Sequence, residues 1–248
     1  VTLSKMCGSG MKAAMMAHDM LLAGTHDVMV AGGMESMTNA PYLLQKGRGG
    51  YRLGHDRIFD HMMLDGLEDA YEPGRSMGTF GEDCAAKYGF TRAEQDAFAT
   101  ASVERAKAAT ASGAFAAEIT PVTVKSRAGE TVVSVDEGPG KVKLDKIASL
   151  KPAFKKDGTI TAASSSSIND GAAALVMMRA STATKLGCKP LARIVGHATH
   201  AQEPEWFATA PLGATQKALA KAGWAVGDVD LWEINEAFAV VPMALMKE

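Results

Sequence analysis

The chain has 248 residues, of which 47% are hydrophobic and 22% are charged, and its formal net charge is -2 at pH 7. This composition supplies apolar material for one sizeable core or two smaller ones, and it excludes fibrous and disordered chains. A nearly neutral chain without a Lys/Arg cluster excludes a strong electrostatic footprint for nucleic acid. No run approaches the ~20 apolar residues that a bilayer span needs, so neither a nucleic acid nor a membrane partner is expected.

The cysteines indicate a reducing compartment rather than a framework of disulfide bonds. Cys7, Cys84 and Cys188 are odd in number and far apart, which favours reduced thiols in a cytoplasmic setting over disulfides. They form no CxxC pair, and no metal site is predicted.

The first elements follow the order strand, helix, strand. "VTLSKM" is predicted to be a short strand, a helix is predicted from Gly8 to Gly24, and "DVMVAGG" is predicted to be a buried strand. This order is typical of a parallel α/β layer.

Residues 38–165 contain little strand pattern apart from "VTVKS" and "TVVSV", and we interpret them as a long insertion with its own helices. The clearest of these helices begins after Thr91, which forms a capping box with Glu94, and it ends at Gly113.

A second α/β region follows the insertion. "INDGAAALVMM" has the pattern of a buried strand. After it we expect a strand at 191–195, a helix at 212–223, a strand at 229–234 and a helix from Glu236.

Cys7 is the first candidate for chemistry, because it precedes a run of small residues at a predicted helix start. Unpaired backbone N–H groups and the helix dipole favour an anion there, so the thiol would ionise more easily. Gly8 and Gly10 would let a carbonyl approach the sulfur, which indicates acyl transfer. Two alternatives stay open: Cys7 as a small buried hydrophobe, and "GSGMKA" as a dinucleotide fingerprint with Glu35 on the ribose.

Four motifs, "SKMCGSGMKA", "VAGGMESMTNAPY", "DGAAALVMM" and "EINEAFA", resemble in order and spacing those of the thiolase family. The resemblance implies a layered α/β fold of αβαβα type with an inserted loop domain, incomplete at both ends of this chain. It would place residues 1–37 and 166–182 in the N-terminal half, 38–165 in the loop domain and 183–248 in the C-terminal half. It also implies acetyl-CoA C-acetyltransferase activity and a homotetramer.

The resemblance assigns roles to individual residues. Cys7 would carry the acyl group, and Asn235 would hold a water at an oxyanion site, although it could also cap a helix from Glu236. Residues that would bind the coenzyme A thioester are Leu67, Met77, Lys146, Phe154, Ala162, Ser166, Ile168, Ala237 and Phe238. His197 and His200 are expected to be structural.

Two thiolase motifs are not found here: the G-H-P histidine and the second cysteine in C-x-G-G-G-x-G. We therefore expect a partial sequence that is a poor Claisen catalyst alone, slower by ~10²–10⁴-fold without a positioned base. No permanently bound cofactor is expected, and coenzyme A thioesters would be the substrates. The alternatives are a non-catalytic acyl-CoA-binding module and a dinucleotide-dependent oxidoreductase.

Overall fold

The computed structural model describes all 248 residues, Val1 to Glu248. They divide into two compact units. Unit 1 comprises Val1–Met77 and Ile168–Glu233, and unit 2 comprises Gly78–Ser167 and Ile234–Glu248. None of the helices is both long and apolar enough to cross a membrane.

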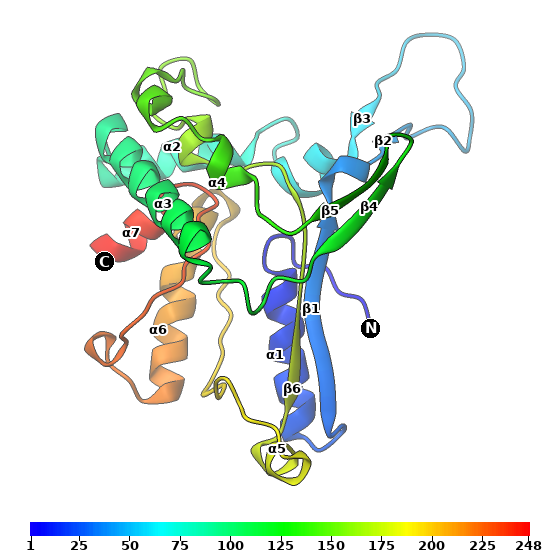
Figure 1. Ribbon diagram of the computed structural model, residues 1–248. Helices are drawn as coiled ribbons and strands as arrows, with labels where there is room; N and C mark the ends of the chain where they lie inside the picture. The colour runs from blue at the N-terminus through cyan, green and yellow to red at the C-terminus, as the bar shows by residue number, and fades with distance from the viewer. The chain divides into compact units, whose positions relative to one another are not determined.

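The elements are labelled in Figure 1. Unit 1 contains α1 (Ser9–Leu22), β1 (Val28–Ser36), β2 (Tyr42–Leu43), β3 (Phe59–Asp60), β6 (Asp170–Met178), α5 (Ala180–Leu186) and α6 (Ala210–Ala222). Unit 2 contains α3 (Arg92–Ser112), β4 (Val122–Ser126), β5 (Gly129–Val133), α4 (Gly138–Lys141) and α7 (Val240–Lys247). Helix α2 (Met77–Tyr88) begins at the last residue of the first segment of unit 1.

The longest strands, β1 and β6, pair antiparallel from Val28↔Met178 to Ser36↔Asp170. Gly32 permits this close pairing, because a Cβ added there would lie 2.1 Å from the carbonyl oxygen of Ala173. The predicted parallel layer is wrong for these strands. Residues 1–6 form no strand, so the expected strand, helix, strand unit has no first member.

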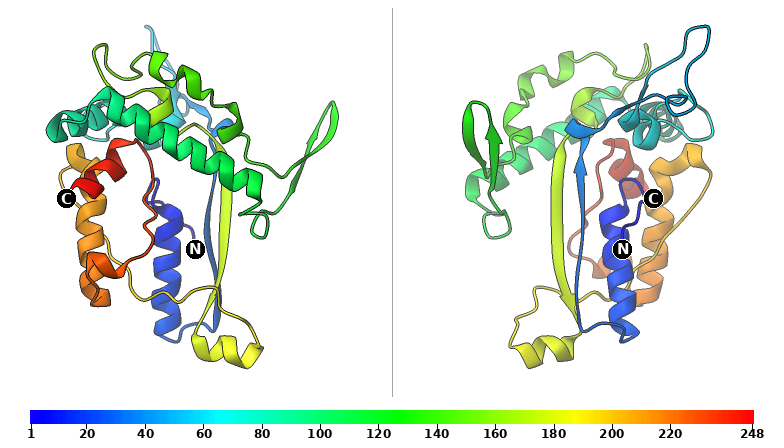
Figure 2. Two further views of the ribbon diagram at one scale, coloured as in Figure 1. Left: turned by 60° about the vertical axis from the view of Figure 1, so that its left-hand side comes forward. Right: turned by 90° about the vertical axis from the view of Figure 1, so that its right-hand side faces the viewer.

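Helix α1 lies along the β1–β6 pair, as both views in Figure 2 show. Ala17 and Leu21 are buried against Ala31 and Met177, because residues four apart share one face of a helix. At the start of α1 the contact is closer still, since a Cβ added at Gly33 would lie 3.1 Å from the Cα of Gly10.

Helix α1 covers only part of one face of the strand pair, since Leu175, opposite Ala31, is 56% exposed. Side chains alternate between the faces of a strand, and α1 covers the face that carries Ala31, which is 6% exposed. The neighbouring Val30 is 70% exposed, and its cross-strand partner Val176 is 68% exposed. The prediction of a strand at 27–33 is therefore confirmed, whereas the prediction that this strand is buried is wrong for most of its residues.

Unit 2 is built around α2 and α3. Helix α3 has the predicted capping box at Thr91 and Glu94, and it ends at Gly113 with φ of 70°. The buried face of α2 includes Phe80 and Cys84, which are 1% and 0% exposed. The two short strand patterns form β4 and β5, which pair as an antiparallel hairpin.

The C-terminal predictions are confirmed only in part. Helix α6 forms as expected and ends at Gly223 with φ of 70°. Residues 191–195 and 229–234 are not strands, and the last helix begins at Val240 rather than Glu236.

Candidate functional site

Cys7 is exposed and lies one residue before Gly8, the N-cap of α1. The helix, predicted to begin at Gly8, begins one residue later at Ser9, so Cys7 lies just before its first turn. The thiol still lies at the positive end of the helix dipole, where unpaired N–H groups accumulate. Its exposure rules out the alternative of a small buried hydrophobe.

The backbone around Cys7 is tightly bonded. Gly8 N–H donates to the Lys5 carbonyl at 3.0 Å, and Ser9 N–H donates to the Met6 carbonyl at 3.1 Å. The Ser9 hydroxyl accepts from Lys5 N–H at 2.8 Å and donates to the Met6 carbonyl at 2.7 Å. These hydrogen bonds therefore fix the backbone both before and after Cys7.

Met6 has φ of 48° and is the single non-glycine residue with a positive φ in the chain. Such a backbone costs about 1–3 kcal/mol and persists where neighbouring bonds hold it, often at a functional site. Here the Ser9 hydroxyl and amide, which both bond Met6, provide that support. The sequence contains no signal for this conformation.

Gly10 has a packing role that the sequence did not indicate. Its close contact with Gly33 brings the start of α1 against β1. The dinucleotide interpretation gains nothing from this arrangement, because Glu35 lies on β1 opposite Gly171 in an antiparallel pair.

Several predicted substrate-binding residues meet in unit 2. Ser166 N–H donates to the Ala237 carbonyl and Ala239 N–H donates to the Ser164 carbonyl, each at 2.9 Å. Between these bonds, Ser165 and Phe238 form an antiparallel bridge. The "SSSS" and "EAFA" segments, remote in sequence, are therefore joined by main-chain bonds.

An aromatic pair lies beside this bridge. The rings of Phe154 and Phe238 meet edge to face, with centroids 5.6 Å apart. Two glycines of α2 make room for the cluster. A Cβ added at Gly78 would lie 2.2 Å from Phe154, and one at Gly81 would lie 2.7 Å from Ile160 and 3.2 Å from Phe238. Phe238 is 7% exposed and Phe154 is 36% exposed, so Phe154 presents part of its ring to solvent.

Glu82 supports this cluster and was missed in the sequence. Its carboxylate accepts from Thr159 N–H at 2.9 Å, from the Thr159 hydroxyl at 3.0 Å and from Ile160 N–H at 2.8 Å. These bonds fix the segment that follows Phe154. Glu82 itself is buried, with 6% of its surface exposed. An acidic residue on the apolar face of "GEDCAA" was the signal that could have revealed it.

Asn235 is exposed and does not cap a helix, because α7 begins at Val240 with Ala239 at its N-cap. The helix-cap alternative is therefore wrong. The next residue, Glu236, is held by the Ser102 hydroxyl at 2.8 Å and by the Ser166 hydroxyl, which donates to its carbonyl at 2.7 Å.

The remaining candidates are dispersed. Lys146 is exposed and lies 3.4 Å from Asp145, and Ala162 begins a short 3-10 turn. Three others belong to unit 1: Leu67, Met77 and Ile168. Within unit 2 the structure therefore joins Phe154, Ser166, Ala237 and Phe238 in one cluster.

The imidazoles of His197 and His200 each lie within hydrogen-bond distance of another side chain. His197 Nε2 lies 2.9 Å from an oxygen of Asp19, and His200 Nε2 lies 3.0 Å from Gln202 Oε1. The second ring nitrogen of His200 is buried without a hydrogen bond.

Comparisons with known proteins match the whole chain. The family model described as "Thiolase, N-terminal domain" matches residues 1–181, and "Thiolase, C-terminal domain" matches residues 188–248. The chain is 48% identical to an acetyl-CoA acetyltransferase of Chromobacterium violaceum, over 100% of the chain and 63% of that relative. It is 49% identical to acetyl-CoA acetyltransferase 2 of Arabidopsis thaliana, over 99% of the chain and 62% of that relative. The chain therefore spans less than two thirds of the length of these relatives.

Solved structures show the same fold. An acetyl-CoA acetyltransferase from Syntrophomonas wolfei superimposes with a TM-score of 0.93 at 42% identity, covering 100% of this chain and 62% of that one. The Bacillus anthracis acetyl-CoA acetyltransferase gives 0.94 at 41% identity, covering 99% and 62%. These values confirm the predicted α/β fold of thiolase type.

Proposed function

Because the chain belongs to the thiolase family, we propose that Cys7 accepts an acyl group from a coenzyme A thioester in an acetyl-CoA C-acetyltransferase reaction. The observation that carries the proposal is the exposed sulfur beside a helix start, held between the strained Met6 and the bonded Ser9. An accessible thiol at the positive end of a helix dipole is suited to nucleophilic attack.

The reaction would run in two steps. The sulfur of Cys7 attacks the thioester carbonyl, the carbon–sulfur bond to coenzyme A breaks, and the thiol proton of Cys7 leaves with coenzyme A. In the second step a proton leaves the α-carbon of a second acetyl-CoA, and that carbon attacks the acyl-cysteine. A carbon–carbon bond forms, the bond to Cys7 breaks and the sulfur regains a proton. The reverse sequence is thiolytic cleavage.

Other residues would position the substrate. Asn235 would hold a water near the developing oxyanion, where a hydrogen-bond donor is most effective. The exposed edge of Phe154, with Phe238 beside it, offers an apolar surface for the pantetheine or acyl group, and Lys146 would contact phosphate. The further lining residues of this proposal are Leu67, Met77, Ala162, Ser166, Ile168 and Ala237. No permanently bound cofactor enters the scheme.

The same proposal extends to the domain organisation, location and oligomeric state of the protein. Residues 1–37 and 166–182 would belong to the N-terminal thiolase half, 38–165 to the loop domain and 183–248 to the C-terminal half. We place the protein in the cytoplasm as a homotetramer. Three free cysteines support a reducing compartment.

Competition between thiols of the same chain tests the acyl transfer. The protein is incubated with acetoacetyl-CoA or acetyl-CoA, digested and examined by mass spectrometry for acylated cysteine peptides. We expect Cys7 to be acylated well before Cys188. Cys188 is also exposed, but it follows the C-terminal end of helix α5 instead of preceding a helix. A Cys7→Ser variant should lose the rapid thioester label and keep the slow background at Cys188.

Two outcomes would contradict the proposal. If Cys7 and Cys188 are labelled at equal rates, the surroundings of Cys7 contribute nothing beyond exposure. If coenzyme A binds but neither thiol is acylated during prolonged incubation, the chain acts as an acyl-CoA-binding module.

A further inference from the structure

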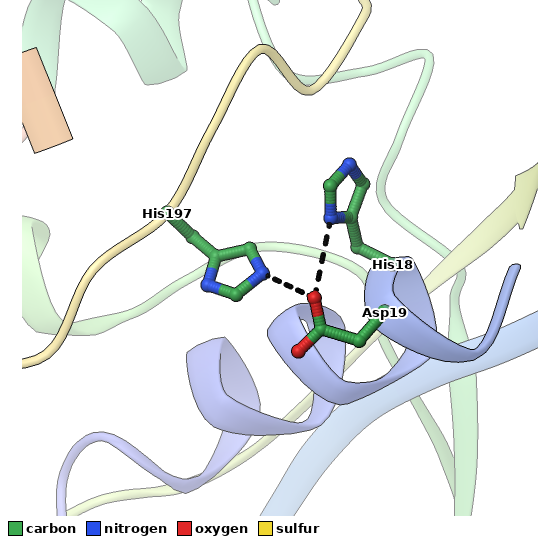
Figure 3. Close-up of side chains that lie close together, drawn as sticks. All are labelled: His18, Asp19 and His197. Carbon is green, nitrogen blue, oxygen red and sulfur yellow. Dashed lines mark hydrogen bonds and ion pairs between the residues drawn. The ribbon is translucent and has the colours of Figure 1, made fainter. Parts of the chain in front are cut away.

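A second group of reactive side chains lies in unit 1, outside the proposed acyl-transfer residues. His18 and Asp19 belong to the C-terminal half of α1, and His197 comes from the segment between α5 and α6. Figure 3 shows the two imidazoles converging on one oxygen of Asp19. Nε2 of His197 lies 2.9 Å from this oxygen and Nδ1 of His18 lies 3.8 Å from it.

The spacing of these atoms suits a metal ion. One ligand atom from each residue can be chosen so that all three lie within 4.8 Å of one another. Tetrahedral Zn²⁺ with bonds of about 2.0–2.1 Å separates its ligand atoms by roughly 3.3–3.4 Å. The two contacts to Asp19 lie on either side of that separation, and the two histidine nitrogens lie within 4.8 Å of each other, so side-chain rotations would have to bring all three atoms to it.

The Nδ1 atom of His18 is available as a ligand. Nδ1 of His18 is buried and has no hydrogen-bond partner, although buried polar atoms are normally bonded. The His18 side chain is 19% exposed, whereas the Asp19 side chain is 62% exposed. The group is therefore backed by protein on one side and open to solvent on the other, where an ion could enter and keep a water ligand.

The segment that carries His197 is held in place by α6. Lys221 donates to the His197 carbonyl at 2.9 Å, and Lys217 contacts the Thr199 carbonyl at 3.4 Å. The imidazole of His197 meets that of His18 edge to face, with ring centroids 5.2 Å apart. The two rings are therefore positioned by packing and main-chain bonds as well as by their shared contact with Asp19.

We propose that His18, Asp19 and His197 form a binding site for a divalent transition-metal ion of the Zn²⁺ class. Two imidazoles and one carboxylate are ligands that Zn²⁺, Co²⁺ and Ni²⁺ accept, whereas Mg²⁺ and Ca²⁺ prefer oxygen donors alone. Because the ligands come from α1 and from residue 197, a bound ion would fasten two segments that are distant in sequence. The site is independent of the proposed chemistry at Cys7.

The test is a titration of untagged protein with Zn²⁺ by calorimetry, and with Co²⁺ by its visible absorption. Cys7 and Cys188 are alkylated beforehand, because exposed thiols are competing ligands. We expect one saturable site per chain and a Co²⁺ spectrum without thiolate charge transfer. Circular dichroism would show that each variant is folded.

Three variants locate the site. Loss of a residue that only supports a metal ligand weakens binding by about 10–100-fold, so Asp19→Asn and His197→Ala should each weaken it by at least about 100-fold. His55→Ala removes an exposed imidazole elsewhere in unit 1 and should leave the affinity unchanged. The proposal is overturned if the wild-type chain shows no saturable site, or if folded Asp19→Asn and His197→Ala both bind as the wild type does.

Discussion

At the scale of single residues, the three cysteines have the same side chain and three different surroundings. Cys7 and Cys188 are exposed, and Cys84 is fully buried on the inner face of α2. Burial penalises the thiolate, and it raises the pKa of Cys84 from 9.0 to about 11. The nearby Lys87 opposes this shift only partly.

This difference predicts which thiols react. Iodoacetamide at pH 8 should modify Cys7 and Cys188 and should reach Cys84 only after unfolding in urea. Intact mass would count the modified thiols and peptide mapping would locate them. Rapid modification of Cys84 in the folded chain would contradict its buried placement.

The same raised pKa makes stability depend on pH. The unfolded thiol ionises near its ordinary pKa of 9.0, while the folded thiol keeps its proton until about 11. Between these values ionisation therefore favours the unfolded state, and the stability contributed below pH 9 is lost as pH rises. Urea midpoints at pH 8, 9 and 10 should fall less steeply in Cys84→Ala than in the wild type. Parallel slopes would exclude this thiol as a cause.

Glu82 carries a second prediction at this scale. Glu82→Ala leaves the N–H groups of Thr159 and Ile160 without their acceptor inside the protein. Each unsatisfied buried donor costs about 1–3 kcal/mol, so the free energy of unfolding should fall by roughly 2–6 kcal/mol. Glu130→Ala is the matched control, since Glu130 is exposed on β5 and should change stability little. Equal losses in the two variants would contradict the structural role of Glu82.

At the scale of elements, α2 shows a helix face shaped for its neighbours. Gly78 and Gly81 lie three residues apart, so they share one side of the helix. There they contact the rings of Phe154 and Phe238. A helix normally gains stability when alanine replaces an internal glycine, and the close contact in α2 reverses that expectation.

Gly78→Ala should therefore destabilise the chain by about 1–3 kcal/mol, because the new methyl group occupies the position of the Phe154 ring. Gly66→Ala is the control, since a Cβ added at Gly66 meets no atom within 4 Å. Chemical denaturation measures both variants. A stabilising Gly78→Ala would show that the ring does not rest on this glycine.

Local signals predicted elements best where they are complete within a few residues. Helix α3 has its cap at Thr91 and its left-handed glycine at Gly113, and both were visible in the sequence. The start of α7 was not, because Ala237 and Ala239 bond the backbone of Ser166 and Ser164. Such a long-range pairing overrides helix propensity, and no local pattern contains it.

The candidate site divides in the same way. The motif around Cys7 was recognisable, whereas the φ of Met6 and the bonds to Glu82 depend on geometry that composition does not encode. His18 and His197 are 179 positions apart, so only the fold places them together. The segments 191–195 and 229–234 had strand composition but formed no ladder, since a strand requires a partner as well as propensity.

At the scale of the whole molecule, several apolar side chains of one face of the β1–β6 pair are exposed. The outer face of the β1–β6 pair carries Val28, Val30, Met34 and Val176, all exposed. A single hydrophobic residue at the surface is ordinary, but a contiguous apolar face binds apolar probes and promotes association. Because successive side chains along β1 point to opposite faces, a substitution can change one face of the strand pair without changing the other.

The last prediction uses that alternation. The double variant Val30→Thr and Val176→Thr changes two cross-strand partners on the open face. It should lower the fluorescence of the dye ANS and shift the free energy of unfolding by less than about 0.5 kcal/mol, as surface changes do. Ala31→Thr, one position along, points into the contact with α1 and should cost about 1–3 kcal/mol. If Val30 and Ala31 responded alike, α1 would not be packed on one face of the strands, and the start of the helix beside Cys7 would lose the support that Gly10 and Gly33 provide.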